Sequence, residues 1–155
     1  MPKLQMEIAL KSFGELAATE LYEILHLRNL VFVQEQNCVF VDTDFKDQSS
    51  LHLMFKEGEQ LLAYTRLLPE GVSYTDYTSI GRVVSLPAAR GTGMGKALML
   101  QSIAQIEKHF GTKFPIKIGA QLYLEQFYAS FGFEKVGPVY DEDGIDHIHM
   151  IRQWV

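Results

Sequence analysis

The chain has 155 residues, of which 47% are apolar and 21% charged, and its formal net charge at pH 7 is −5. This length predicts one folded domain, residues 1–155, and the composition is that of an ordinary globular protein. The negative charge disfavours nucleic acids and anionic membranes as partners, and no run approaches the roughly 18 apolar residues of a membrane span.

Cys38 is the only cysteine, which excludes an intrachain disulfide and is typical of a protein of the reducing cytoplasm. The stretch Met1 to Glu7 lacks the apolar core of a signal peptide. We therefore expect a cytoplasmic protein, either a monomer or a homodimer. The cysteine and the histidines have no spacing typical of a metal site, so we expect no metal.

Strands dominate the predicted elements of the first half. The alternation of Met6, Ile8 and Leu10 predicts a strand, and a helical repeat of apolar residues predicts a helix over 17–33. A polar, acidic loop over 34–50 follows. The apolar runs beyond it predict a hairpin and a third strand after a second loop, with these bounds: residues 51–56, 61–68 and 80–86.

Strand and helix alternate in the second half. Apolar residues at helical spacing predict a helix from Ala97 to Phe110, and a short strand over 116–119 leads into a helix that Gly132 ends. Residues 133–139 and 145–154 flank a turn and predict a terminal hairpin. The fold class is α/β (α+β): a mixed, mostly antiparallel sheet flanked by helices and closed by a C-terminal hairpin.

The most informative motif is a glycine-rich loop between the strand that ends at Leu86 and the following helix. It reads Arg90-Gly91-Thr92-Gly93-Met94-Gly95-Lys96. Three glycines at the start of a helix leave several backbone N–H groups open at its positive end, which favours binding of a phosphate or pyrophosphate. The spacing is neither that of the dinucleotide fingerprint nor that of the P-loop, because Lys96 is followed by Ala97.

A second motif, Phe127-Tyr128-x-x-x-Gly132-Phe133, follows about thirty residues later. Together, Arg-x-x-Gly-x-Gly and this motif resemble the GNAT superfamily of acyltransferases. Strings elsewhere resemble its ElaA subgroup, so that the similarity covers nearly the whole chain. These strings are Leu27-Arg28-x-x-Val31-Phe32-Val33-x-Glu35-Gln36, Ser79-Ile80-Gly81-Arg82-Val83-Val84 and Val139-Tyr140-x-Glu142-Asp143-Gly144-Ile145.

The resemblance implies a GNAT-like fold, an acyl-CoA (acetyl-CoA) cosubstrate and transfer of an acyl group, an acetyl group in this family's pattern, to a small-molecule or peptide amine. It implies that the amide of Val83 polarises the thioester carbonyl and that Tyr128 protonates the coenzyme A thiolate. It further implies a set of residues that contact the cofactor: Val83, Val84, Ser85, Arg90, Gly91, Thr92, Gly93, Met94, Gly95, Lys96, Gln121 and Tyr128. Gln121 stands where many family members have Asn. A phenol near pKa 10 and a thiol near 8.5–10 are nearly matched for proton transfer.

The acceptor side is less defined by the sequence. The resemblance places the acidic loop and the last hairpin there, with Glu35, Asp42, Asp44 and His147 as candidate substrate contacts. The acidic residues are interpreted either as a solvated loop or as a negative funnel for a cationic amine. Candidates for a general base remain open, as does a water chain in its place: Glu35, Asp42, Asp44, His52, His147 and His149. His147 and His149 fit a partly buried structural role equally well.

Two alternatives to an N-acetyltransferase stay open. Leu27-Arg28, the carboxylates from Asp42 to Asp47, and Arg66-Leu67-Leu68-Pro69 resemble the front half of acyl-homoserine lactone synthases. Those chains are longer and lack the Arg-x-x-Gly-x-Gly loop. The other alternative is a module that binds acyl-CoA without turnover.

Overall fold

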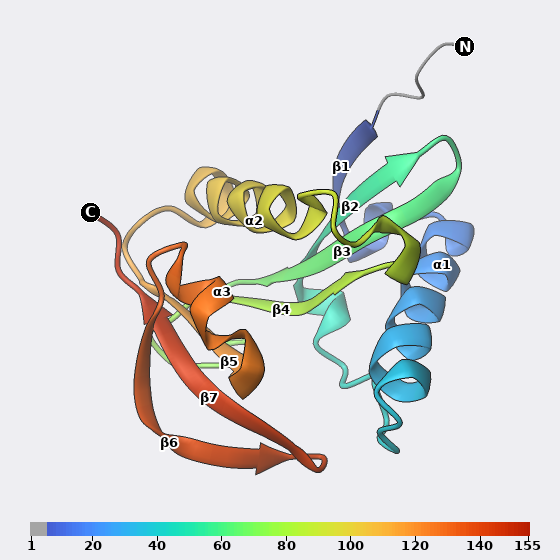
Figure 1. Cartoon of the computed structure of the whole chain (residues 1–155). Coiled ribbons are helices and arrows are strands. Elements are labelled where there is room, and N and C mark those ends of the chain that lie inside the picture. The colour runs from blue at the N-terminus through green and yellow to red at the C-terminus, as the bar shows by residue number, and fades with distance from the viewer. Residues whose placement is uncertain (1–5) are drawn as a thin grey trace.

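The computed structural model describes residues 6–155, so that Met1 to Gln5 of the N-terminal stretch discussed above lie outside the described residues. Two antiparallel sheets carry the architecture (Figure 1). The first has the order β1 (Met6–Ser12), β2 (Leu51–Glu57), β3 (Gln60–Leu68), β4 (Ser79–Ser85). The second has the order β5 (Ile116–Gln121), β7 (Ile145–Arg152), β6 (Glu134–Glu142).

The two sheets meet at one point and then separate. Thr78, just before β4, forms a parallel bridge with Ile116 at the start of β5. The amide of Lys117 donates to the carbonyl of Thr78 at 2.9 Å, and the amide of Thr78 donates to the carbonyl of Pro115 at 3.1 Å. No further pairing joins β4 to β5 among the described residues, so the two strands diverge toward their carboxyl ends.

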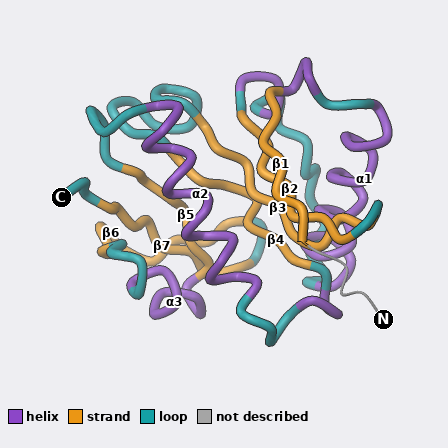
Figure 2. The backbone as a smooth tube through the Cα atoms, turned by 90° about the horizontal axis from the view of Figure 1, so that it is seen from above, coloured by secondary structure: helices purple, strands orange, loops and turns teal. Residues whose placement is uncertain are grey.

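Helices cover both faces of the first sheet (Figure 2). Alternate residues of a strand point to opposite faces. One face presents Met54, Tyr64 and Val84 to the helix α1 (Ala18–Arg28), and the other presents Leu53, Phe55 and Ala63 to the helix α2 (Met94–Phe110). This double cover explains why β3 is buried along almost its whole length instead of on alternate residues only.

The third helix and the end of α2 cover the second sheet. The short α3 (Glu125–Ala129) contributes Tyr128 to a cluster with Ile118 and Ile148, and α2 adds Ile103 and Ile106 to the same core. Gly132 follows α3 with a φ of +94°, as expected for a glycine that ends a helix. The predicted fold is confirmed in its mixed, mostly antiparallel sheets, its flanking helices and its terminal hairpin.

Two local irregularities were not predicted. The first is at the end of α1, where the chain continues in a wider π-helical form, η2 (Asn29–Glu35), two residues beyond the predicted end at Val33. The second is a bulge in β4: Tyr64 pairs with Val84 and Arg66 with Gly81, so two residues of β4 oppose one of β3. Extra residues of this kind bend a strand and increase its twist. Both irregularities border the opening between the two sheets.

Candidate active site

A cleft of about 760 Å³ occupies the space where β4 and β5 diverge. Its walls come from β4, β5, α3, the β6–β7 hairpin and the segment after α1. The structure brings ten of the predicted site residues into these walls: Val83, Val84, Ser85, Arg90, Gly95, Gln121, Tyr128, Glu35, Asp44 and His147. The two sheets therefore splay apart beside β4.

The glycine-rich loop has the backbone that an anion site requires. Gly91 and Gly93 have φ values of +80° and +82°, and Gly93 caps α2 without any side-chain hydrogen bond to the first turn. The N–H groups at this helix terminus thus remain available to an anion. An added Cβ at either glycine would meet no atom within 4 Å, so the space beside the loop is open.

Not every residue of the loop lines the cleft. Thr92, Gly93 and Met94 border a smaller hollow of about 490 Å³ beside the β2–β3 hairpin, and the side chain of Met94 is buried in the core. Gly91 and Lys96 are exposed at the surface. The backbone of these five residues stays a predicted pyrophosphate contact at the mouth of the cleft.

Arg90 stands at the junction of loop and cleft. Its Nη1 donates to Oε1 of Glu35 at 2.6 Å, and its Nη2 donates to the carbonyl of Ser85 at 3.3 Å. This contact places Glu35 beside the glycine-rich loop, which corrects its expected position on the opposite, acceptor side. An ion pair this exposed contributes little stability, so Arg90 is easily released to a bound phosphate.

Tyr128 lies between the apolar core and the cleft. Its ring is 6% exposed and packs edge-on against Phe127 and Phe133, with ring centroids 5.2 and 6.2 Å apart. Burial raises the pKa of Tyr128, with a further contribution from Tyr123, so the phenol is protonated at neutral pH.

The segment 35–38 lines the cleft and contacts the second sheet, which the sequence did not predict. The side-chain amides of Gln36 and Gln121 form a reciprocal pair, with N···O distances of 3.3 and 3.2 Å. The thiol of Cys38 donates to the carbonyl of Asp143 in the β6–β7 turn at 3.1 Å. Figure 1 shows that turn reaching toward the end of η2. Gln121 thus faces the cleft, but its amide is already paired.

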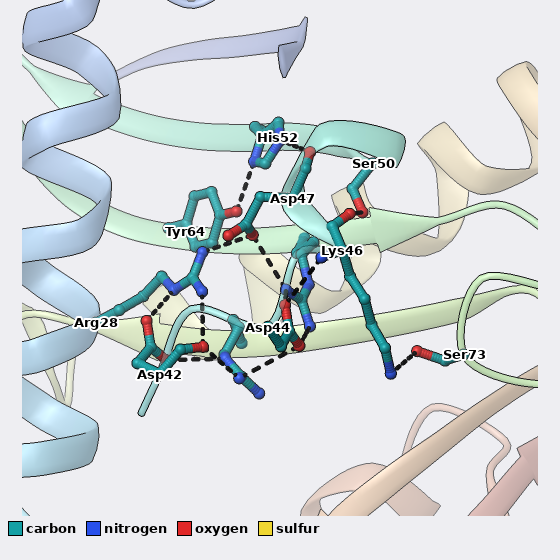
Figure 3. Close-up of polar contacts among 11 residues, drawn as sticks. Arg28, Asp42, Asp44, Lys46, Asp47, Ser50, His52, Tyr64 and Ser73 are labelled. Atoms are coloured by element: carbon teal, nitrogen blue, oxygen red, sulfur yellow. Dashed lines mark hydrogen bonds and ion pairs between the residues drawn. The ribbon is translucent and has the colours of Figure 1, made fainter. Parts of the chain in front are cut away.

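The carboxylates of the loop after η2 are buried in an ion-pair network (Figure 3). Arg28 is fully buried, and it donates from Nε to Asp42 at 2.8 Å and from Nη1 to Asp47 at 2.7 Å. Burial alone would raise the pKa of Asp47, but the guanidinium of Arg28 outweighs it and lowers that pKa. Asp42 and Asp47 are 4% and 5% exposed, so their interpretation as part of a solvated loop is wrong.

Asp44 joins the same network from the side of the cleft. It accepts two hydrogen bonds from Arg66, at 2.7 and 2.8 Å, and lies 3.5 Å from Arg82. Arg82 also pairs with Asp42, from Nε to Oδ1 at 2.9 Å. Three arginines thus neutralise the three carboxylates. The expected negative funnel is corrected accordingly: Asp42 does not line the cleft, and Asp44 is held by a bidentate pair.

The three candidate histidines have different surroundings. His52 is fully buried outside the cleft, between the hydroxyl of Tyr64 at 2.6 Å and the carbonyl of Asp47 at 2.9 Å, which makes it a structural residue. His149 stacks on Tyr140, with ring centroids 4.6 Å apart, and does not line the cleft. His147 lines the cleft and lies 3.2 Å from Glu142.

Two kinds of feature are absent from residues 6–155. Within this range, no three or more His, Cys, Asp or Glu side chains gather closely enough to hold a metal ion. No helix in the same range has both the length and the apolar composition needed to cross a membrane.

Comparisons with known proteins agree with this geometry. A family model described as an acetyltransferase (GNAT) domain matches residues 30–153. The chain is 40% identical to protein ElaA of Escherichia coli over 142 residues, which cover 90% of this chain and 92% of ElaA. The crystal structure of Escherichia coli ElaA superposes with a TM-score of 0.89 at 38% identity, covering 96% of this chain and all of the other (100%).

Two other solved structures are informative. An acyl-CoA N-acyltransferase from Pseudomonas aeruginosa matches with a TM-score of 0.89 at 39% identity, covering 96% of this chain and 99% of the other. The acyl-homoserine lactone synthase LasI matches with a TM-score of 0.74 at 13% identity over 96% of this chain and 90% of LasI, which shows a shared fold alone. The match of the family model and the identity to ElaA show that this chain belongs to the GNAT family of acetyltransferases.

Proposed function

We propose that the chain is an acyl-CoA-dependent N-acyltransferase that transfers an acetyl group to a primary amine of a small molecule or peptide. The observation that carries the proposal is the cleft between β4 and β5, which places Val83 and Tyr128 in the walls of one cavity. Acyl transfer needs a donor to the thioester carbonyl and a donor to the departing sulfur, and these two residues supply one each.

The open edge of β4 suits the pantetheine arm of coenzyme A. An extended ligand with amide groups binds a free strand edge as an additional strand would. All seven residues of β4, Ser79 to Ser85, line the cleft, and Val83 has no register partner on β3 because of the bulge. The pyrophosphate would then lie against the backbone of Gly91 to Lys96, with Arg90 beside it and Gln121 on the opposite wall.

The reaction proposed is a direct attack of the amine on the thioester. The N–H of Val83 would stabilise the negative charge that develops on the carbonyl oxygen. Tyr128 would donate its hydroxyl proton toward the sulfur as the carbon–sulfur bond breaks. Because the pKa of Tyr128 is raised, it no longer nearly equals that of a thiol. We therefore propose that Tyr128 acts mainly by donating a hydrogen bond to the thiolate.

The acceptor is proposed as an amine without a preference for added positive charge. The carboxylates of Asp42 and Asp44 are neutralised by arginines, and the nearby Lys46 donates from Nζ to the hydroxyl of Ser73 at 3.1 Å. A cationic side chain of the acceptor would find little uncompensated negative charge on this wall. Glu142 and Asp143, on the hairpin, are the exceptions.

The two alternative functions receive less support. The resemblance to acyl-homoserine lactone synthases depended on Arg28, Arg66 and the carboxylates between them, but these residues bind one another in a closed network. A module that only binds acyl-CoA would not need a phenol at the cleft wall.

A thiol-release assay tests the proposal. The protein is incubated with acetyl-CoA, with and without a set of primary amines that includes alkyl amines, amino acids and peptides. We expect release of coenzyme A that depends on an amine and yields the acetylated amine by mass spectrometry. Tight binding of acetyl-CoA without amine-dependent release would favour the binding module.

A further inference from the structure

Both ring nitrogens of His147 face hydrogen-bond acceptors. Nδ1 lies 2.8 Å from the carbonyl oxygen of Ile145, and Nε2 lies 3.2 Å from Oε2 of Glu142. A carbonyl oxygen only accepts, so Nδ1 must carry a hydrogen. The neutral ring then has its lone pair on Nε2, the nitrogen that faces Glu142. Only the imidazolium can donate to both acceptors at once.

The charged group that Nε2 of His147 contacts is a carboxylate, that of Glu142. The titratable groups packed around His147 are Tyr140 and Glu142 on β6 and His149 on its own strand, while the neutral Gln121 is its register partner on β5. Burial raises the pKa of Tyr140 to about 12, so this phenol remains neutral. Glu142 is the charged group in contact, and its side chain is 56% exposed, so it can turn toward solvent.

We propose that His147 is the general base of the reaction and that Glu142 stabilises the imidazolium formed. The proposal rests on the acyltransferase function above. Nε2 takes a proton from the acceptor ammonium, and the freed lone pair of the amine forms the carbon–nitrogen bond. The carbon–sulfur bond breaks with its electron pair on sulfur. The nitrogen then loses a second proton, which balances the proton that the sulfur receives through its hydrogen bond with Tyr128. The imidazolium of His147 returns the first proton to solvent.

The other candidate bases are engaged elsewhere. Glu35 lies beside Arg90, on the side of the cleft proposed for the pyrophosphate, Asp44 is paired with Arg66, and Asp42 is buried outside the cleft. His52 has a partner on each ring nitrogen and lies outside the cleft. His147 is the candidate in the cleft wall whose proton-accepting nitrogen is not held by a cation.

Two acceptor amines of the same shape distinguish a general base from a residue that only positions the substrate. Ethylamine is an ammonium ion at neutral pH and must lose a proton before it attacks, whereas methoxyamine is already uncharged. The variant His147→Asn keeps an N–H donor near the carbonyl of Ile145 but removes the base. His149→Asn is the matched control, because it changes the histidine two positions along the same strand, outside the cleft.

The expected result is a selective loss. His147→Asn should lower kcat/KM for ethylamine by about 10²–10⁴-fold and that for methoxyamine by less than about threefold, since only the first substrate needs a base. His149→Asn should leave both values within about threefold of the parent. An equal loss with both amines, or no loss with ethylamine, would contradict the proposal.

Ring ¹⁵N NMR of the parent protein bound to coenzyme A gives a second test that needs no turnover. Neutral His147 should carry its hydrogen on Nδ1 and leave Nε2 bare. A neutral ring with its hydrogen on Nε2 would overturn the proposal even if neither small amine is acetylated. Failure of acetyl-CoA to bind the parent protein would instead refute the acyltransferase function itself.

Discussion

The hydroxyl of Tyr128 combines an apolar environment with access to the cleft. Desolvation of the ring disfavours the phenolate, so the group keeps its proton over the whole working range of pH. A stronger acid would transfer its proton more readily but would also ionise more easily. In the proposed mechanism, burial makes Tyr128 a hydrogen-bond donor to the sulfur that keeps its own proton, which limits its contribution to the rate.

Replacing Tyr128 by Phe should lower kcat without weakening acetyl-CoA binding. The loss should lie near the lower end of the usual range for general acid catalysis, about 10²-fold, because the raised pKa limits full proton transfer. Steady-state kinetics with the preferred amine measures kcat, and calorimetry measures the dissociation constant of acetyl-CoA. Phe127→Leu serves as a control for ring packing at the neighbouring position. Equal kcat values for Tyr128→Phe and the parent, with the chemical step shown to be rate-limiting, would show that Tyr128 has a purely structural role.

The ligand binding proposed for the loop before α2 depends on the conformation of its backbone. Gly93 has a φ of +82°, a left-handed conformation that a β-branched residue adopts only with strain. The strain would shift the N–H groups that are proposed to bind the pyrophosphate. The loop therefore needs glycine for the geometry of its backbone, since nothing lies within 4 Å of an added Cβ.

The variant Gly93→Val should bind acetyl-CoA more weakly by about 1–3 kcal/mol, which is the loss expected when amide contacts to a charged group are broken. Calorimetric titration measures the affinity. The matched control is Gly111→Val at the other end of α2, where φ is +79° and the space is also open, but no ligand contact is proposed. Unchanged affinity in a folded Gly93→Val protein would place the pyrophosphate elsewhere.

The sequence predicted the elements well because their signals are local. Apolar periodicity marked the strands and helices, and the glycines of the Arg90 to Lys96 loop marked its backbone. The contacts of Gln36 with Gln121 join residues 85 positions apart, and no local pattern predicts such a pair. The sequence does contain one signal for the buried network. Arg28 and Arg66 interrupt apolar runs, and a charge at such a position needs a buried partner.

At the scale of the whole molecule, the ion-pair network joins α1, the acidic loop and the first sheet. Asp47 is its centre, because Oδ1 accepts from Arg28 at 2.7 Å and from Arg66 at 3.0 Å. This arrangement holds the segment after η2 against β3 and so fixes one wall of the cleft. Removing one member leaves buried cations without compensation, which costs more than the pair contributes.

Asp47→Asn should lower the free energy of unfolding by about 3–5 kcal/mol, as is typical when one partner of a buried ion pair is removed. Urea denaturation measures the change. Asp76→Asn makes the same change of charge at an exposed position of left-handed φ, which Asn tolerates, and should have little effect. A small loss for Asp47→Asn would show that the network is dispensable for stability.

The dependence of stability on pH has a defined direction. The folded state lowers the pKa of Asp44, Asp47 and Glu20, so their contribution is present above the unfolded value near 4 and is lost as the pH falls below it. Burial also lowers the pKa of His52, which adds a loss that begins as the pH falls below about 6.5. Denaturation at a series of pH values should show both losses, and Asp47→Asn should flatten the acidic one. Stability that rises on acidification from pH 7 to pH 4 would contradict these assignments.

The proposed function requires the cleft between β4 and β5 to bind acyl-CoA, and a pair of calorimetric titrations measures this binding. One titration uses acetyl-CoA and the other uses S-adenosylmethionine, the substrate expected for a homoserine lactone synthase. We predict saturable binding of acetyl-CoA with one site per chain and no binding of S-adenosylmethionine. Binding of S-adenosylmethionine, or the absence of binding by acetyl-CoA, would contradict the account.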